Sequence, residues 1–268
     1  MQELLRVVEE PRRCPYLPHK KASLEYRLVL DLDAKTYADL LARGYRRFGH
    51  QLFRPACSGC EECVSLRVLT PMFQPSRSQR RVLRQNSHIR VERRRPFVSD
   101  QHIRLLNRYH EFMAKHRGWP YETTTKESYI DSFVLGGGTF AWQWLYYDHG
   151  HLIGVALMDE VENAISLVYH FYDPRWRPLS PGTFSVLTQL AYAQQQGLNY
   201  AYPGYWVAEN SSMSYKTKFQ PHERLARYPG DAEQPVWTEG RHEAPATNHW
   251  PHKQQAQPKA VHPQETRA

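Results

Sequence analysis

Alternation of apolar and polar residues predicts strands in the first quarter of the chain. Three segments alternate as half-buried strands do: 23–32, 46–55 and 64–70. A helix is predicted between the first two strands, over 34–44, and Gly44 ends it. Pro71 and Pro75 then separate the last strand from a short helix predicted over 76–86.

A long amphipathic helix opens the second half of the chain. It begins at the predicted N-cap Ser99 and runs to Arg117. Helical spacing predicts one buried stripe, which consists of Ile103, Leu106, His110 and Met113. After another helical segment comes a triple glycine at 136–138, which we interpret as a flexible connection because a strand follows it.

Aromatic-rich strands follow the triple glycine. They span 139–147, 151–158 and 164–172, and short turns join them, so an antiparallel meander is predicted. Residues 181–197 then predict a helix that ends at Gly197, and 198–206 predict a further strand. The order of meander, helix and strand is typical of an acyltransferase-like α/β domain.

Length predicts two domains, and the order of predicted elements indicates an α/β protein with mixed, largely antiparallel sheets. The 268 residues are 41% hydrophobic, enough for one large or two modest cores. The predicted division is an N-terminal domain over 1–97, a C-terminal domain over 98–230 and a disordered tail over 231–268, which is rich in Pro, Gln and His. No apolar run approaches about 18 residues and the first residues have no apolar signal region, which predicts a cytoplasmic protein without a membrane span.

Positive charge is concentrated in one segment. The chain has a net charge of +8, and residues 77–95 hold eight arginines against the single acid Glu92. Four of these arginines share one face of the predicted helix: Arg77, Arg80, Arg81 and Arg84. Such a face favours a nucleic-acid phosphate backbone, and the alternative is a solvated basic surface with no partner.

All four cysteines lie in the first quarter of the chain, at Cys14, Cys57, Cys60 and Cys63. The spacing C-x2-C-x2-C lets several thiolates converge on one soft metal, either zinc or an iron–sulfur cluster. A disulfide framework is less consistent with so long a chain and so few cysteines. The alternative is a set of free thiols in a tight turn around Gly59.

Candidate catalytic side chains gather in and after the meander. They are Asp159, Tyr169, His170, Tyr205, Tyr215 and Lys216. Taken singly, an Asp at a strand end is often a turn residue, and a strand tyrosine is often part of the core. The sequence contains no P-loop, G-x-S-x-G elbow, H-E-x-x-H helix or dinucleotide fingerprint.

The order of several strings is more specific than any single residue. The stretch GVALMDEVENAISLVYHFYDPRWRPLSPGT, followed by GLNYAYPGYW and MSYK, resembles the C-terminal region of the arginyl-tRNA-protein transferase family. CPYLP, LEYR, FRPACSGCEECVSLRV and SRSQRRVLRQN resemble its N-terminal region, specifically the bacterial aspartate/glutamate leucyltransferase branch. The resemblance covers about residues 10 to 225.

This resemblance implies a GNAT-like fold and aminoacyl transfer. Charged tRNA would donate an amino acid to the N-terminal amine of a protein that begins with Asp or Glu, which marks that protein for degradation. No cofactor is needed for this chemistry, although iron–sulfur clusters have been linked to cysteines of eukaryotic members. Membership of the bacterial branch favours leucyl-tRNA as donor, with arginyl-tRNA as the alternative.

Roles follow from the chemistry as hypotheses. Asp159 would orient or deprotonate the amine, while Tyr169 or Tyr205 would donate to the oxyanion or to the leaving ribose. Lys216 would contact the terminal adenosine's phosphate or the acceptor's carboxylate. The residues assigned to tRNA or acceptor binding are Arg77, Arg80, Arg81, Arg84 and Tyr215.

One departure from the family pattern limits this transfer of roles. Relatives commonly place a cysteine and a Lys-Met pair in the segment that here contains Asn210 to Ser212, so no role of that cysteine carries over. Met213, Tyr215 and Lys216 remain. A rival hypothesis is a metal-stabilised module that binds tRNA or another structured RNA without catalysis.

Overall fold

Two main β-sheets organise residues 1–240, the part of the chain that this computed structural model describes. The smaller sheet has the strand order β1-β4-β6-β5, with bounds Gln2–Val8, Leu24–Leu30, Gln51–Pro55 and Arg46–Phe48. A separate ribbon pairs β2 (Arg12–Arg13) with β3 (Lys21–Ala22).

The larger sheet has eight strands in the order β14-β13-β7-β12-β11-β10-β9-β8. Their bounds, in that order, are Trp237–Glu239, His222–Leu225, Val64–Leu69, Tyr200–Trp206, Ala164–Tyr172, His151–Val161, Ala141–Asp148 and Arg90–Arg94. Neighbouring strands are antiparallel except β11 and β12, which are parallel. The predicted class, α/β with mixed and largely antiparallel sheets, is confirmed.

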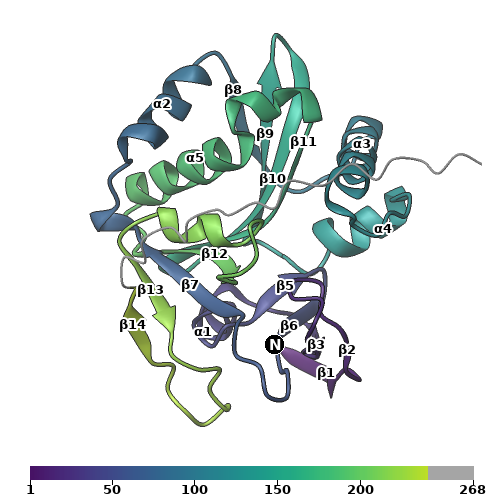
Figure 1. Ribbon diagram of the computed structural model, residues 1–268, viewed down its shortest axis with the longest axis vertical. Helices are drawn as coiled ribbons and strands as arrows, with labels where there is room; N and C mark the ends of the chain where they lie inside the picture. The colour runs from purple at the N-terminus through teal and green to yellow at the C-terminus, as the bar shows by residue number, and fades with distance from the viewer. Residues whose placement is uncertain (241–268) are drawn as a thin grey trace, which may run out of the picture.

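Helices cover both faces of the larger sheet (Figure 1). On one face lie α2 (Arg77–Gln85) and α5 (Pro181–Gln195), which pack with Tyr146 of β9. On the other face lie α3 (Asp100–Arg117) and α4 (Lys126–Tyr129), which pack with the neighbouring Leu145. Because successive strand residues point to opposite faces, one strand serves both cores. A third core packs α1 (Ala34–Ala42) below β10, β11 and β12.

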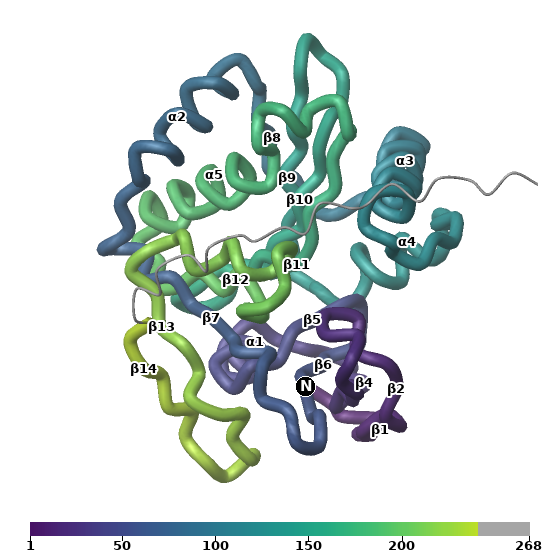
Figure 2. Tube along the Cα trace, viewed as in Figure 1, coloured from purple at the N-terminus to yellow at the C-terminus, as the bar shows by residue number. Residues whose placement is uncertain are grey.

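Short helical turns complete the fold. They are η1 (Thr70–Met72), η2 (Ile130–Val134), η3 (Pro174–Leu179) and η4 (Ser214–Lys218). Figure 2 shows β7, which is early in the chain, lying beside the much later β12. Since β7 and β8 both join the larger sheet, the two predicted domains share one sheet, and the boundary at residue 97 stays a prediction.

Most predicted elements are present in the structure. The strand over 23–32, the helices over 34–44 and 76–86, and the meander correspond to β4, α1, α2 and β9–β11. Ser76 and Gln79 form a capping box that starts α2, and Ser99 caps α3. The segment 46–55 is instead a hairpin, β5–β6, because Gly49 takes a positive φ and turns the chain.

Two local predictions are wrong. The buried residues of α3 are His102, Leu105, Leu106, Tyr109 and Met113, so Ile103 and His110 lie at the edge of the buried stripe. The triple glycine is packed and is not simply a flexible connection, since a Cβ on Gly136 would lie 2.1 Å from the carbonyl oxygen of Gly49. This close backbone contact joins the β5–β6 hairpin to the end of η2.

The tail predicted to be disordered from residue 231 begins with ordered chain. Asp231 forms ion pairs with Arg6 and Arg27 of the smaller sheet. Trp237 of β14 lies over Arg67, and β14 pairs with β13. A composition with almost no aliphatic residues gave no sign of these contacts. The remaining tail, 241–268, lies outside the described residues.

A search of the described helices for a membrane span found none of sufficient length and hydrophobicity.

Candidate active site

Strands β11 and β12 run side by side for three residue pairs and then separate. The pairs are Ala164 with Tyr200, Ile165 with Ala201, and Ser166 with Tyr202. Beyond them β11 stays paired to β10, and β12 stays paired to β7. We call this opening the fork. Within the fork, the facing edges of β11 and β12 are not paired with each other. Backbone N–H groups on these edges are therefore available to a ligand.

A bulge lies on β11 within the fork. Leu157 and Met158 of β10 are consecutive, but they pair with Tyr169 and Leu167, so Val168 is an additional residue. Bulges redirect side chains and are frequent beside active sites. Tyr169, one of the predicted catalytic residues, comes directly after this bulge.

Arg46 joins the two branches of the fork. It begins β5 and is 8% exposed. Its guanidinium donates to the carbonyl of Leu167 on β11 at 2.5 Å and to that of Tyr202 on β12 at 3.0 Å. Sequence reasoning missed this residue, because an arginine in an alternating strand looks like an exposed position. The only signal was its place in a strand whose neighbours were predicted to be buried.

Lys216 lies beside Arg46 on the β12 branch. It is 7% exposed, and its Nζ donates to the carbonyl of Tyr205 at 2.6 Å. Burial, followed by the nearby charge of Arg46, lowers the pKa of Lys216 to about 7. Among the described residues, no carboxylate forms an ion pair with this ammonium. Lys216 therefore changes charge near neutral pH.

The hydroxyl of Tyr205 is directed away from the opening of the fork. Tyr205 is buried, and its hydroxyl lies within hydrogen-bond distance of the carbonyls of Phe53 at 3.0 Å and Gly44 at 3.1 Å. Burial raises its pKa well above the ordinary value. The side chain thus connects β12 to the smaller sheet, while its backbone carbonyl holds Lys216.

Tyr169 contributes an aromatic wall on the β11 branch. Its ring stacks on Phe133, with centroids 5.5 Å apart, and meets Phe48 edge-on. Its hydroxyl lies 2.9 Å from Nε2 of His110 on α3. Burial raises the pKa of Tyr169 and lowers that of His110, so both groups favour their neutral forms. Sequence reasoning assigned His110 only to an apolar stripe.

Tyr215 lies on η4, next to Lys216 in sequence. It is half-buried against the core below α5, with its ring 6.4 Å from that of Phe219. Burial raises its pKa to about 12, and the neighbouring Tyr172 of β11 contributes to this shift. Tyr172 and Tyr215 therefore lie near each other on the α5 side of the fork.

Asp159 lies at the closed end of the fork, on β10 opposite Ser166. It is 1% exposed, and both carboxylate oxygens accept from Arg47, at 2.6 and 3.1 Å. Arg47 also donates to the carbonyls of Gly49 and Leu135. This bidentate pair ties the larger sheet to the β5–β6 hairpin.

The predicted basic face is separate from the fork. Arg77, Arg80, Arg81 and Arg84 are all exposed on α2, whose Val82 and Leu83 pack into the core with α5. The edge strand β8 extends this basic surface, and Arg93 lies 3.7 Å over the ring of Trp142. The structure therefore brings together Tyr205 and Lys216, with Tyr169 on the facing branch, and separates them from the α2 arginines.

The four cysteines lie near one another without forming a metal site. All are free, and Cys14, Cys57 and Cys63 pack with Leu17 and Val207. Burial raises the pKa of Cys63 to about 12, and the other three thiols add to the shift. Within residues 1–240, however, no three His, Cys, Asp or Glu side chains are arranged to hold a metal ion. As placed, the four cysteines do not fit the shared metal site predicted for them.

Two family models match the chain. The model described as "Arginine-tRNA-protein transferase, N terminus" matches residues 12–81, and "Arginine-tRNA-protein transferase, C terminus" matches residues 101–226. The second match includes the fork from β10 to η4.

Named relatives match over most of their length. The protein is 38% identical to an aspartate/glutamate leucyltransferase of Helicobacter hepaticus, covering 87% of this chain and 98% of the relative. It is 37% identical to that of Campylobacter jejuni, covering 80% and 89%, and 35% identical to that of Pseudomonas putida, covering 84% and 96%.

Solved structures show more distant similarity. L-PGS from Bacillus licheniformis matches with a TM-score of 0.44 and 14% identity, covering 67% of this chain and 51% of that one. FemX matches with a TM-score of 0.42 and 13% identity, covering 68% and 63%.

Proposed function

Because the chain belongs to the arginine-tRNA-protein transferase family, we propose that it transfers leucine from leucyl-tRNA to the N-terminal amine of proteins that begin with Asp or Glu. It is an aminoacyltransferase. The observation that carries this proposal is the match to the Helicobacter hepaticus leucyltransferase over 98% of that enzyme's length. The product would be a substrate for degradation, and the use of charged tRNA as donor supports a cytoplasmic reaction.

The reaction requires modest catalytic equipment. The acceptor's α-amine attacks the ester carbonyl, a C–N bond forms, and the C–O bond to the terminal ribose breaks. The amine must first lose a proton, since an α-ammonium has a pKa of about 7.7 to 8.0. Once it is neutral, the site must hold it against the ester and stabilise the developing oxyanion.

Lys216 is our choice for the group that receives this proton. It is buried beside Arg46, and its pKa near 7 leaves a large neutral fraction at neutral pH. When protonated, the same group suits the contact with a phosphate or carboxylate predicted from the sequence. The two roles separate by pH, because proton acceptance needs the neutral form and anion binding needs the charged form.

The β11 branch is our choice for oxyanion stabilisation. Beyond Ser166, the edge of β11 that faces the fork has no strand partner in β12. Backbone N–H groups fixed in this way are donors that need no reorganisation during reaction. Tyr169, held by His110, would donate to the leaving ribose oxygen. Asp159 is a positioning residue in this proposal, because Arg47 occupies both of its oxygens.

The walls of the fork favour leucine over arginine as the transferred residue. Phe48, Phe133 and Tyr169 form an aromatic cluster beside the fork. An arginine side chain would need a free carboxylate, whereas Asp159 is already paired with Arg47. The arginyl donor remains the alternative that the transfer assay must test.

The α2 arginines supply the proposed contact with the tRNA backbone. All four side chains are exposed, and Arg80 donates to the carbonyl of Pro75. Because these side chains are exposed on the face of α2 opposite the one that packs into the core, we assign Arg77, Arg80, Arg81 and Arg84 to phosphates in preference to the acceptor carboxylate. No step of the proposal uses a metal, since the cysteines do not fit a ligand set.

The test is a transfer assay with labelled leucyl-tRNA. We expect label on a peptide that begins with Asp or Glu, none on the same peptide beginning with Ala, and little transfer from arginyl-tRNA. Preferential arginine transfer would overturn the choice of donor. If tRNA binds but neither amino acid is transferred, the non-catalytic RNA-binding module would replace the proposal.

A further inference from the structure

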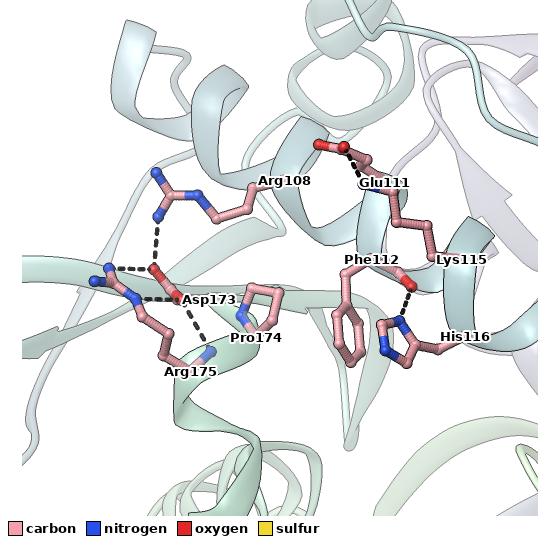
Figure 3. Close-up of a pocket in the computed structure, with 8 residues that line it drawn as sticks. All are labelled: Arg108, Glu111, Phe112, Lys115, His116, Asp173, Pro174 and Arg175. Atoms are coloured by element: carbon pink, nitrogen blue, oxygen red, sulfur yellow. Dashed lines mark hydrogen bonds and ion pairs between the residues drawn. The ribbon is translucent and has the colours of Figure 1, made fainter.

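A hollow of about 550 Å³ lies between the C-terminal half of α3 and the junction of β11 with η3 (Figure 3). The residues that line it are Arg108, Glu111, Phe112, Lys115, His116, Asp173, Pro174 and Arg175. Strand β11 ends at Tyr172, so the hollow begins where the open end of the fork reaches the surface.

Asp173 organises the floor of this hollow. It is buried, and it accepts from the backbone and guanidinium of Arg175 and from Nη1 of Arg108 at 2.7 Å. The hydrogen bonds from the Arg175 side chain are the largest cause that lowers the pKa of Asp173 to about 2. The carboxylate is therefore ionised at neutral pH and holds two guanidinium groups side by side.

Both guanidinium groups remain available to a ligand. Arg108 is 53% exposed and Arg175 is 83% exposed. A guanidinium has five N–H groups, and the contacts with Asp173 use one from Arg108 and two from Arg175. Fixed arginines with free N–H groups are suited to bind phosphate oxygens.

The balance of charge around the hollow also favours an anion. Three basic side chains line it, whereas Glu111 and Asp173 are the two acids. Burial raises the pKa of Tyr172, and the nearby charges of Arg177 and Arg117 oppose this rise. They add positive charge at the side that faces the fork.

Two aromatic rings line the hollow beside these charges, and two more follow α3 in the chain. Phe112 and His116 stack with centroids 4.0 Å apart and an angle of 23° between their planes. Just after α3, Trp119 is 37% exposed and Tyr121 is 41% exposed. Cationic grooves with exposed rings are typical of sites for single-stranded nucleic acid, because each unpaired base can stack on a ring.

We infer that this hollow binds the single-stranded 3′ end of the donor tRNA. Arg108 and Arg175 hold its phosphates. Its unpaired bases stack on the rings named above: Phe112, His116, Trp119 and Tyr121. Asp173 and Tyr169 are four residues apart along the chain, which corresponds to about 13 Å of strand. A few nucleotides span this distance. The inference rests on the proposed function, which requires the aminoacylated end to reach the fork.

Binding of a short RNA isolates this contact from the rest of the tRNA. The probe is a fluorescent single-stranded oligoribonucleotide that ends in C-C-A, titrated against the full chain. We expect Arg108→Gln and Trp119→Ala each to weaken binding about tenfold. Matched controls are Arg104→Gln, which is one turn earlier on α3, and Phe97→Ala, which removes another exposed ring; both should bind as the unmodified protein does.

Three outcomes separate the hypotheses. Equal binding by all four variants, with thermal midpoints unchanged, would overturn the inference. Weaker binding of an acidic peptide, with RNA binding unchanged, would assign the hollow to the acceptor and also overturn it. Leucine transfer by the unmodified protein is measured in parallel, so absence of transfer counts against the proposed function and RNA binding alone decides the hollow.

Discussion

The two ends of the fork each contain a buried charge, but within residues 1–240 only the charge at the closed end has an ionic partner. There Asp159 is bound through both oxygens by Arg47. On the opening branch, Lys216 has a carbonyl and a cationic neighbour, and burial lowers its pKa to about 7. The ion pair of Asp159 stabilises the fold. A buried ammonium without an ionic partner, such as that of Lys216, reduces the stability of the fold, and such groups are found mainly at functional sites.

The largest expected effect comes from breaking the pair at the closed end. Arg47→Met leaves the Asp159 carboxylate buried without its partner, which should reduce the free energy of unfolding by about 3 to 5 kcal/mol. Urea denaturation measures this loss. The double variant Arg47→Met/Asp159→Leu should recover much of it, and if the double variant is as unstable as the single one, the ion pair is not the cause.

Removal of the Lys216 ammonium should reduce the rate of transfer without reducing stability. Lys216→Met should retain or increase the free energy of unfolding, because it removes a buried ammonium, while kcat for leucine transfer falls by about a hundredfold or more. The control is Lys218→Met, an exposed lysine on the same helical turn. A normal transfer rate in folded Lys216→Met would exclude the residue from the mechanism.

The pH dependence sharpens the comparison. Transfer should increase as pH rises through about 7, where Lys216 beside Arg46 and Cys63 becomes neutral. Stability should rise as well between about 7 and the unfolded value of 10.5, because over that window the unfolded chain holds a proton that the folded protein has released. In Lys216→Met the stability trend should be absent, and the rise in transfer near pH 7 should be lost, which leaves only the rise set by the acceptor amine at about 7.7 to 8.0. Single-turnover rates and denaturation at several pH values measure both.

The smallest expected effect lies outside the fork, on α2. Arg81→Gln should weaken tRNA binding several-fold at low salt and reduce the slope of log affinity against log salt by about 0.9, without changing acceptor choice. Arg67→Gln offers no matched control, because Arg67 pairs with Glu223 and lies over Tyr200. Lys35→Gln, at an exposed position of α1, is a better one. An unchanged salt slope would remove Arg81 from the phosphate contacts.

How far the sequence predicted these regions depends on the range of the interactions. The local patterns that define α2, α3 and the meander were readable, since periodicity and N-caps are properties of neighbouring residues. Lys216 could be selected from its motif, but its burial could not. Arg46 and Arg47 were missed because their partners, Leu167, Tyr202 and Asp159, lie more than a hundred residues away.

The cysteine prediction shows the reverse problem. Cys57, Cys60 and Cys63 have the spacing of metal ligands, and the structure does bring Cys14 near them. Spacing constrains how many thiols can meet, but not the angles at which their sulfur atoms point. Burial with Leu17 and Val207 therefore produced an apolar cluster, in which Cys57 contacts the backbone of Ser23.

The position of β7 in the larger sheet also bears on synthesis of the protein. This strand lies between β12 and β13, and both leave the ribosome long after it. At ordinary rates of translation, β7 must wait on the order of ten seconds for its neighbours, with both of its edges unpaired. A nascent chain that stalls before residue 200 would expose those edges, so we expect this protein to need protection by chaperones while it is being made.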